Sequence, residues 1–155
     1  MTEAAKAISR TILIVEDNPE DYETTIRALK KSGLSNPIKR CEDGDDALDY
    51  LYRREQYADS EKAPKPSVIL LDLNLPGTDG WEVLKEIKQD PNLKSIPVIM
   101  LTTSSAPSDI DKCYLAGANS YVHKPVNLTG FVEAIEKLKN YWFEIVILPE
   151  GEIQS

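Results

Sequence analysis

Five short runs rich in aliphatic and β-branched residues alternate with five longer amphipathic segments, and this alternation constrains the fold more than any other feature of the chain. It is typical of a parallel sheet with helices on both faces. The expected strands are residues 11–15, 37–41, 67–71, 97–101 and 120–122. The expected helices are residues 19–32, 45–57, 79–89, 108–116 and 128–143.

Two runs, residues 12–15 and 68–71, are continuously apolar, which favours central strands that are buried on both faces. The run at 37–41 is interrupted by Lys39 and Arg40 and is therefore expected at an edge. An edge second strand beside central first and third strands predicts an α/β, doubly wound, five-stranded parallel sheet in the order 2-1-3-4-5. Ligands of such sheets bind at the carboxyl ends of the strands, where strands 1 and 3 lie side by side.

The chain has 155 residues, 41% hydrophobic and 28% charged, which fits one globular domain. We expect a flexible segment at 1–10, the domain at 11–144, and an apolar extension and tail at 145–155. Because six residues follow Pro149, no output domain is expected. The chain shows no secretory or membrane-spanning segment, which predicts a cytoplasmic protein without a membrane partner.

The charge and the cysteines exclude several classes of function. Lys and Arg number 18 against 26 Asp and Glu, a net charge of −8, which argues against a nucleic-acid partner bound through its phosphates. Cys41 and Cys113 lie far apart without a C-x-x-C motif. They are interpreted as free buried thiols, and neither a disulfide framework nor a zinc site is expected.

Polar residues follow the predicted strands at the edge where ligands are expected. Glu16 and Asp17 follow the first strand and Asp72 follows the third, so three carboxylates are expected to meet. Their repulsion favours a divalent cation, and an open, all-oxygen site favours Mg²⁺. Thr102 and Lys124 would add a hydroxyl donor and a positive charge, which predicts a site that accepts a phosphoryl group on Asp72.

Strand-end acids have a simpler alternative, because such residues often cap the helix that follows. This alternative is reasonable in part for Asp17, which precedes Asn18 and Pro19. It is weaker for Asp72, which is followed by the turn at 73–77 and not by an immediate helix start.

Four ordered motifs carry a family resemblance: residues 14–18 (IVEDN), 70–80 (LLDLNLPGTDG), 97–103 (PVIMLTT) and 117–125 (GANSYVHKP). Together they resemble the receiver domains of two-component response regulators, over nearly the whole chain. The resemblance implies a flavodoxin-like fold. It also implies that the protein accepts a phosphoryl group from a phosphohistidine of a sensor histidine kinase.

The resemblance further assigns the residues of the acceptor and metal site. It makes Asp72 the phosphoacceptor and a metal ligand. It implies that Asp17 binds Mg²⁺, or Mn²⁺, directly, that Glu16 does so through water, and that Asn74 does so through its backbone carbonyl. Glu16 stands where many family members have Asp, a change that the family tolerates.

Other residues match the family's switch. Thr102 and Lys124 match the residues that hold the phosphoryl oxygens, and Tyr121 matches an aromatic side chain that turns inward as Thr102 moves. Asn74 and Ser104 flank the acceptor at positions where family members tune dephosphorylation. Lys124–Pro125 corresponds to a cis peptide bond of the family.

A finer resemblance links the chain to stand-alone regulators paired with bacterial, especially cyanobacterial, phytochromes. The segments that carry it are residues 43–51, 111–114 and 142–149, with the long loop after the second helix. It implies a phytochrome kinase as partner, with output through protein contacts or through a downstream phosphotransfer protein.

The C-terminal segment adds apolar residues beyond those needed to dock the last helix. Trp142, Phe143, Ile145 and Ile147 are predicted to contact a second copy in a homodimer. The alternative is that this segment folds back on its own subunit.

Two other functions remain open from the residues alone. A Mg²⁺-dependent aspartyl-phosphate phosphohydrolase would also use an Asp nucleophile, but it requires a second Asp where this chain has Asn74. A degenerate receiver acting as a binding module would not need Asp72, Asp17, Thr102 and Lys124 intact.

Overall fold

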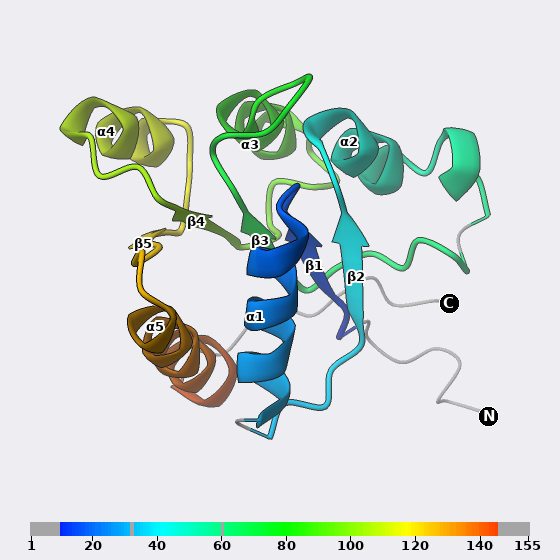
Figure 1. The fold of residues 1–155 in the computed structure, drawn as a ribbon. Helices are drawn as coiled ribbons and strands as arrows, with labels where there is room; N and C mark the ends of the chain where they lie inside the picture. Colours follow the sequence, from blue (N-terminus) through cyan, green and yellow to red (C-terminus); the bar gives the residue numbers. More distant parts are fainter. Residues whose placement is uncertain (1–9, 32, 60, 146–155) are drawn as a thin grey trace.

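The structure, a computed structural model, describes residues 10–31, 33–59 and 61–145. Five parallel strands form one sheet in the order β2-β1-β3-β4-β5 (Figure 1). The predicted strand order and the edge position of the second strand are thus confirmed. The strands are β1 (Ile12–Val15), β2 (Ile38–Cys41), β3 (Val68–Leu71), β4 (Val98–Thr102) and β5 (Ser120–His123).

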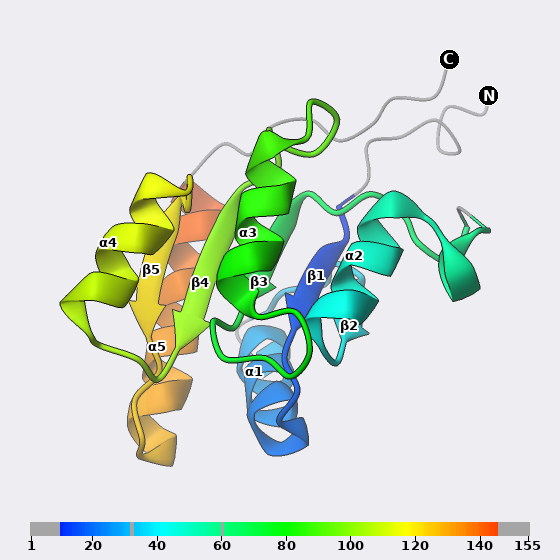
Figure 2. The same ribbon diagram turned by 90° about the horizontal axis from the view of Figure 1, so that it is seen from above.

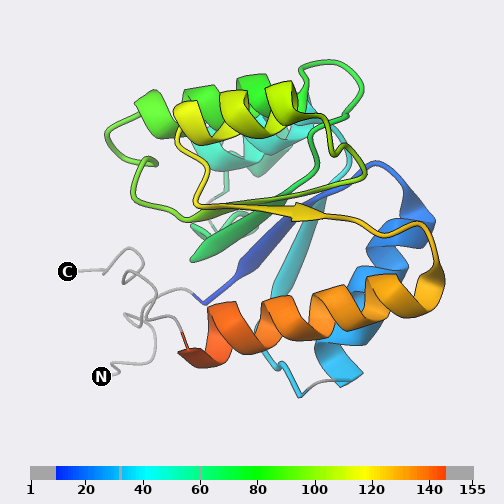
Figure 3. The same ribbon diagram turned by 90° about the vertical axis from the view of Figure 1, so that its left-hand side faces the viewer.

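Helices cover both faces of the sheet, as Figure 3 shows. The α2–α4 layer covers one face and α1 with α5 covers the other, and each layer closes its own apolar core against the strands (Figures 2 and 3). The helices are α1 (Pro19–Lys31), α2 (Gly44–Tyr52), α3 (Gly80–Gln89), α4 (Pro107–Leu115) and α5 (Leu128–Asn140), with a 3₁₀ turn η2 (Glu55–Tyr57) and a π-helical turn η3 (Tyr141–Ile145). Within the described ranges, no helix is long and apolar enough to cross a membrane.

The expected helix at 45–57 is shorter in the structure. It ends at Tyr52 because Arg53 adopts the left-handed conformation, with φ at 53°. The backbone N–H of Arg53 then donates to the carbonyls of Asp49 and Tyr50 and closes the helix end. A left-handed arginine carries no signal in the sequence, since glycine is the usual residue there.

The expected helix at 128–143 starts at Leu128, as predicted, but it ends earlier, at Asn140. Helical periodicity predicts Leu128 on the inward face of this helix, but 66% of the residue is exposed. After Asn140 the chain continues as η3, and there Trp142 is buried in the core beneath α1 and α5, with Phe143 packed against it. These two of the four predicted dimer residues therefore contact their own subunit. The side chain of Ile145 and all of Ile147 lie outside the described residues.

The start of α1 follows directly from the sequence. The side-chain oxygen of Asn18 accepts hydrogen bonds from the backbone N–H groups of Glu20 and Asp21, at 2.9 and 3.1 Å, and Pro19 takes the first helical position. Asn18 is therefore the N-cap of α1. It places the first turn of α1 immediately after the carboxyl end of β1.

The register of the sheet brings the ends of β1 and β3 together. Val15 pairs with Leu71, and the backbone N–H of Asp72 donates to the carbonyl of Val15 at 3.1 Å. The residues that follow these two strands, Glu16 and Asp72, therefore emerge side by side at one edge of the sheet.

Candidate functional site

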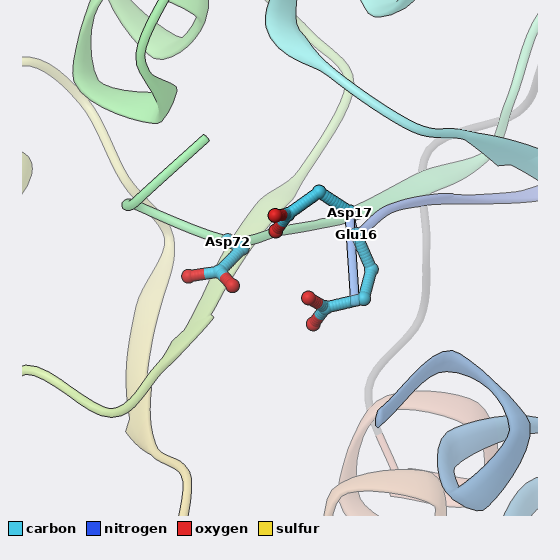
Figure 4. A group of neighbouring side chains, drawn as sticks. All are labelled: Glu16, Asp17 and Asp72. Atoms are coloured by element: carbon cyan, nitrogen blue, oxygen red, sulfur yellow. The ribbon is translucent and has the colours of Figure 1, made fainter. Parts of the chain in front are cut away.

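Three carboxylates meet at this edge, as the strand order requires. Glu16, Asp17 and Asp72 each offer one oxygen, and these oxygens lie within 4.8 Å of one another (Figure 4). Glu16 and Asp72 are buried, whereas Asp17 is exposed. The site is thus closed toward the sheet and open to solvent beside Asp17.

Lys124 is the cation of this site, and only 3% of it is exposed. Its Nζ donates to Glu16 Oε1 at 2.7 Å, to Asp21 Oδ2 at 2.9 Å and to Asp72 Oδ2 at 3.3 Å. Lys124 thus pairs with the Asp72 carboxylate in the absence of a phosphoryl group. The contacts with Glu16 and Asp21 were not predicted from the sequence.

Asp21 is the site residue that sequence reasoning missed. The cap at Asn18 was the available signal, because it starts α1 at Pro19 and places Asp21 in the first turn, next to the strand ends. Whether the Asp21 side chain points toward the strand ends depends on how α1 packs against the sheet. The local sequence does not encode that packing.

The site has an excess of negative charge. Burial, together with the nearby charge of Asp72, raises the pKa of Glu16 to about 7, although the hydrogen bond from Lys124 opposes this shift. Burial alone would lower the pKa of Lys124, but its hydrogen bonds to Glu16 and Asp21 and the charges of Asp72 and Glu16 outweigh burial and raise this pKa. The single positive charge of Lys124 therefore neutralises only part of the negative charge of the surrounding carboxylates. The uncompensated negative charge favours binding of a cation.

The donor set fits a hard divalent ion. All three groups present carboxylate oxygens, and the open side at Asp17 leaves room for water, a combination that suits Mg²⁺ or Mn²⁺. Both oxygens of Glu16 already have donors, Lys124 at Oε1 and the Asn18 N–H at Oε2. This arrangement is compatible with a role for Glu16 through water. Asn74 is exposed at the rim, and its N–H donates to Asp72 Oδ1 at 3.2 Å.

Thr102 and Tyr121 are linked through Ser104. Thr102 is fully buried at the end of β4, and its Oγ1 accepts the N–H of Ser104 at 3.3 Å. The Tyr121 hydroxyl donates to the carbonyl of Ser104 at 2.9 Å, and Ser104 Oγ donates to Asp109 on α4 at 2.6 Å. The two predicted switch residues therefore hold the same loop between β4 and α4.

One expectation near the site is wrong. None of the described peptide bonds is cis, so Lys124–Pro125 is trans. Proline brings the two isomers to within about 1 kcal/mol, and the dipeptide alone therefore does not choose between them.

The geometry can be compared with known proteins. A family model described as "Response regulator receiver domain" matches residues 12–136. The chain belongs to this receiver-domain family. The match lies inside the domain expected at 11–144.

Individual relatives of this receiver point the same way. Response regulator Rcp1 of Synechocystis sp. is 40% identical over 140 residues, which cover 90% of this chain and 93% of Rcp1. The solved Mn²⁺-bound form of Rcp1 superposes with a TM-score of 0.85, covering 90% of this chain and 99% of that one. The solved structure of the phosphorylated cyanobacterial phytochrome response regulator RcpA also superposes with a TM-score of 0.85. It is 39% identical, and the match covers 91% of this chain and 99% of RcpA. The finer resemblance to phytochrome regulators is confirmed.

Mg²⁺ is expected to raise the melting temperature of this receiver, because an ion that binds the folded state stabilises it, by about 2.7 kcal/mol at one hundred times its dissociation constant. Asp17→Asn should remove most of the shift between EDTA and Mg²⁺ in thermal unfolding. Glu133→Gln, at an exposed position on α5, is the control and should keep the shift. An equal shift in Asp17→Asn and the parent would contradict metal binding at this cluster.

Proposed function

We propose that the protein is a phosphorylation switch in which Asp72 accepts a phosphoryl group from a phosphohistidine of a sensor histidine kinase. The observation that carries the proposal is the buried Asp72 carboxylate, which shares one site with two further carboxylates suited to a divalent ion and with the buried ammonium of Lys124. In this proposal Glu16, Asp17 and Asp72, with Asn74, hold Mg²⁺ or Mn²⁺.

The transfer makes one bond and breaks one. An Asp72 carboxylate oxygen attacks the phosphorus, a P–O bond forms, and the P–N bond to the kinase histidine breaks with its electron pair left on the imidazole nitrogen. A bound Mg²⁺ or Mn²⁺ offsets the negative charge of the phosphoryl oxygens. The N–H of Asn74 orients Asp72 at Oδ1, and Lys124 faces Oδ2, where it can donate to a phosphoryl oxygen.

The switch begins at Thr102. In the proposal its hydroxyl donates to a phosphoryl oxygen, which draws the end of β4 toward Asp72. Ser104 is hydrogen-bonded to Thr102 Oγ1, to Asp109 on α4 and to the Tyr121 hydroxyl. The movement of Thr102 therefore shifts the loop that precedes α4, and with it the side chain of Tyr121. The phosphorylated surface then differs at α4 and β5.

We also propose that the protein hydrolyses its own aspartyl phosphate, without being an enzyme for an outside substrate. Asn74 is exposed at the rim beside Asp72, and Ser104 follows the end of β4. At these two positions a side chain can admit or exclude the water molecule that hydrolyses the aspartyl phosphate. We propose that these two residues set the lifetime of the phosphorylated state.

One incubation distinguishes the proposal from its two rivals. The protein is mixed with acetyl phosphate and Mg²⁺, and its intact mass and the release of inorganic phosphate are followed. A receiver gains one phosphoryl group. A phosphohydrolase turns over acetyl phosphate without a stable adduct, and a degenerate receiver shows neither; each of these outcomes would contradict the proposal.

We further propose that the kinase is a bacterial phytochrome and that the exchange takes place in the cytoplasm, where ATP is available to the kinase. The names of the relatives support this pairing, since RcpA is described as a cyanobacterial phytochrome response regulator. Phosphotransfer from a panel of purified kinases tests it: a phytochrome should lose its label to this protein fastest. Output would pass to a protein partner or to a downstream phosphotransfer protein.

A homodimer through the C-terminal segment remains part of the proposal. Tyr141 is 52% exposed beside the buried Trp142, and the apolar Ile145 and Ile147 follow. Ile145→Asp with Ile147→Asp should give a monomer in sedimentation while Asp72 still accepts the phosphoryl group. Truncation after Asn140 is unsuitable, because it also removes Trp142 from the core. A parent protein that is monomeric with and without beryllofluoride would contradict the dimer.

A further inference from the structure

Asp21 is a fourth carboxylate at the site, and it contacts Lys124 rather than the three-carboxylate cluster. Its Oδ2 accepts from Lys124 Nζ at 2.9 Å. The backbone of Asp21 is held by the cap at Asn18 and by the Thr25 hydroxyl, which donates to the Asp21 carbonyl at 2.8 Å. The side chain is therefore presented to Lys124 from a fixed first turn of α1.

Lys124 has no donor left over in this arrangement. An ammonium group carries three N–H donors, and Nζ makes three contacts, with Glu16, Asp21 and Asp72. The contact with Asp72 is the longest of the three, at 3.3 Å. To donate to a phosphoryl oxygen on Asp72, the ammonium must weaken one of its other two contacts.

The burial of the two other carboxylates, Glu16 and Asp21, determines which contact of Lys124 is weakened at the lower cost. The side chain of Glu16 is 5% exposed, so its carboxylate would lose a partner that water cannot replace. The side chain of Asp21 is 31% exposed, so water can solvate its carboxylate after the ion pair opens. Asp21 is the partner that Lys124 can leave at the lower cost.

We propose that Asp21 is a positioning residue that holds the Lys124 ammonium in the resting state and releases it when Asp72 carries a phosphoryl group. This inference rests on the proposed function. Asp21 competes with the phosphoryl oxygens for Lys124, and it therefore disfavours the activated state. A chain without this carboxylate binds a phosphoryl mimic more tightly.

The test is a titration with beryllofluoride, a phosphoryl mimic, at saturating Mg²⁺, followed by NMR of the full chain. Asp21→Asn should lower the Kd for beryllofluoride about fivefold, the modest size expected for a partly exposed ion pair. It should also speed hydrogen exchange of the resting Lys124 ammonium. Asp21→Ser is a second variant that lacks the carboxylate and suits a first helical turn.

Glu20→Gln is the matched control. It removes the same charge one residue away on the same turn, from an exposed side chain, and it should change the Kd by less than about twofold. An unchanged or raised Kd in both Asp21 variants, or an equal gain in Glu20→Gln, would overturn the inference while the proposed function stands. A parent that does not bind beryllofluoride would overturn both.

Discussion

Asp72→Asn is expected to lose phosphorylation completely and to keep its fold. The amide has nearly the same shape as the carboxylate, and its one oxygen can still accept the Asn74 N–H, whereas its NH₂ group replaces the oxygen that accepts from Lys124. It lacks the nucleophilic carboxylate oxygen, so no acyl phosphate can form. Intact mass after incubation with acetyl phosphate and Mg²⁺ should show no adduct, and the circular dichroism spectrum should match that of the parent.

Asp79→Asn is the control for this experiment. Asp79 is also an acidic residue of the segment after β3, but it is exposed, and its carboxylate caps α3 by accepting the N–H of Glu82. Its variant should still gain one phosphoryl group, with a loss of about 1 kcal/mol of stability at most from the changed cap. A yield of phosphoryl adduct in Asp72→Asn equal to that of the parent would contradict the assignment of Asp72 as the acceptor.

Lys124→Met is expected to produce the largest loss of stability among the site variants. It leaves the carboxylates of Glu16, Asp21 and Asp72 without the ammonium that they share. Removing one partner of a buried charge pair costs about 3 kcal/mol or more, because the remaining charge stays in a poorly solvated place. Urea unfolding in EDTA should show this decrease in the free energy of unfolding.

The same variant should recover part of its stability in Mg²⁺, since a divalent ion supplies the missing positive charge. Lys137→Met, at an exposed position on α5, is the control and should change the free energy of unfolding by less than about 0.5 kcal/mol in either buffer. Equal stability of Lys124→Met and the parent in EDTA would mean that the ammonium does not hold the carboxylates together.

The sheet was predictable because its signals are local. Continuous apolar runs mark β1 and β3, and the charged side chains of Lys39 and Arg40 mark the edge strand. The first four strands were each predicted one residue early, at Thr11, Pro37, Ser67 and Pro97. Both prolines accept a sheet hydrogen bond at their carbonyl, but they have no N–H to donate to the ladder.

The helix ends depend on contacts that the local sequence does not encode. The left-handed conformation of Arg53 cannot be predicted from its residue type, because arginine rarely adopts a positive φ. The π-helical continuation after Asn140 places Trp142 against α1 and α5, a contact between segments far apart in the chain.

The site was predictable to the extent that parallel strand ends meet. The order of the strands brings Glu16, Asp17 and Asp72 together, and Lys124 follows a strand that ends at the same edge. The choice of partners for Lys124 depends on the packing of α1 against the sheet. The role of Asp21 could therefore be recognised only from the structure.

Locating the phosphoryl group shows directly whether Asp72 is the acceptor and whether the transfer requires a divalent ion. The parent protein is incubated with acetyl phosphate in Mg²⁺ or in EDTA, digested at acid pH, and its peptides are sequenced by tandem mass spectrometry. We expect one phosphoryl group, on Asp72, formed in Mg²⁺ and greatly reduced in EDTA. A phosphoryl group on another residue, or the same yield on Asp72 in EDTA, would contradict it.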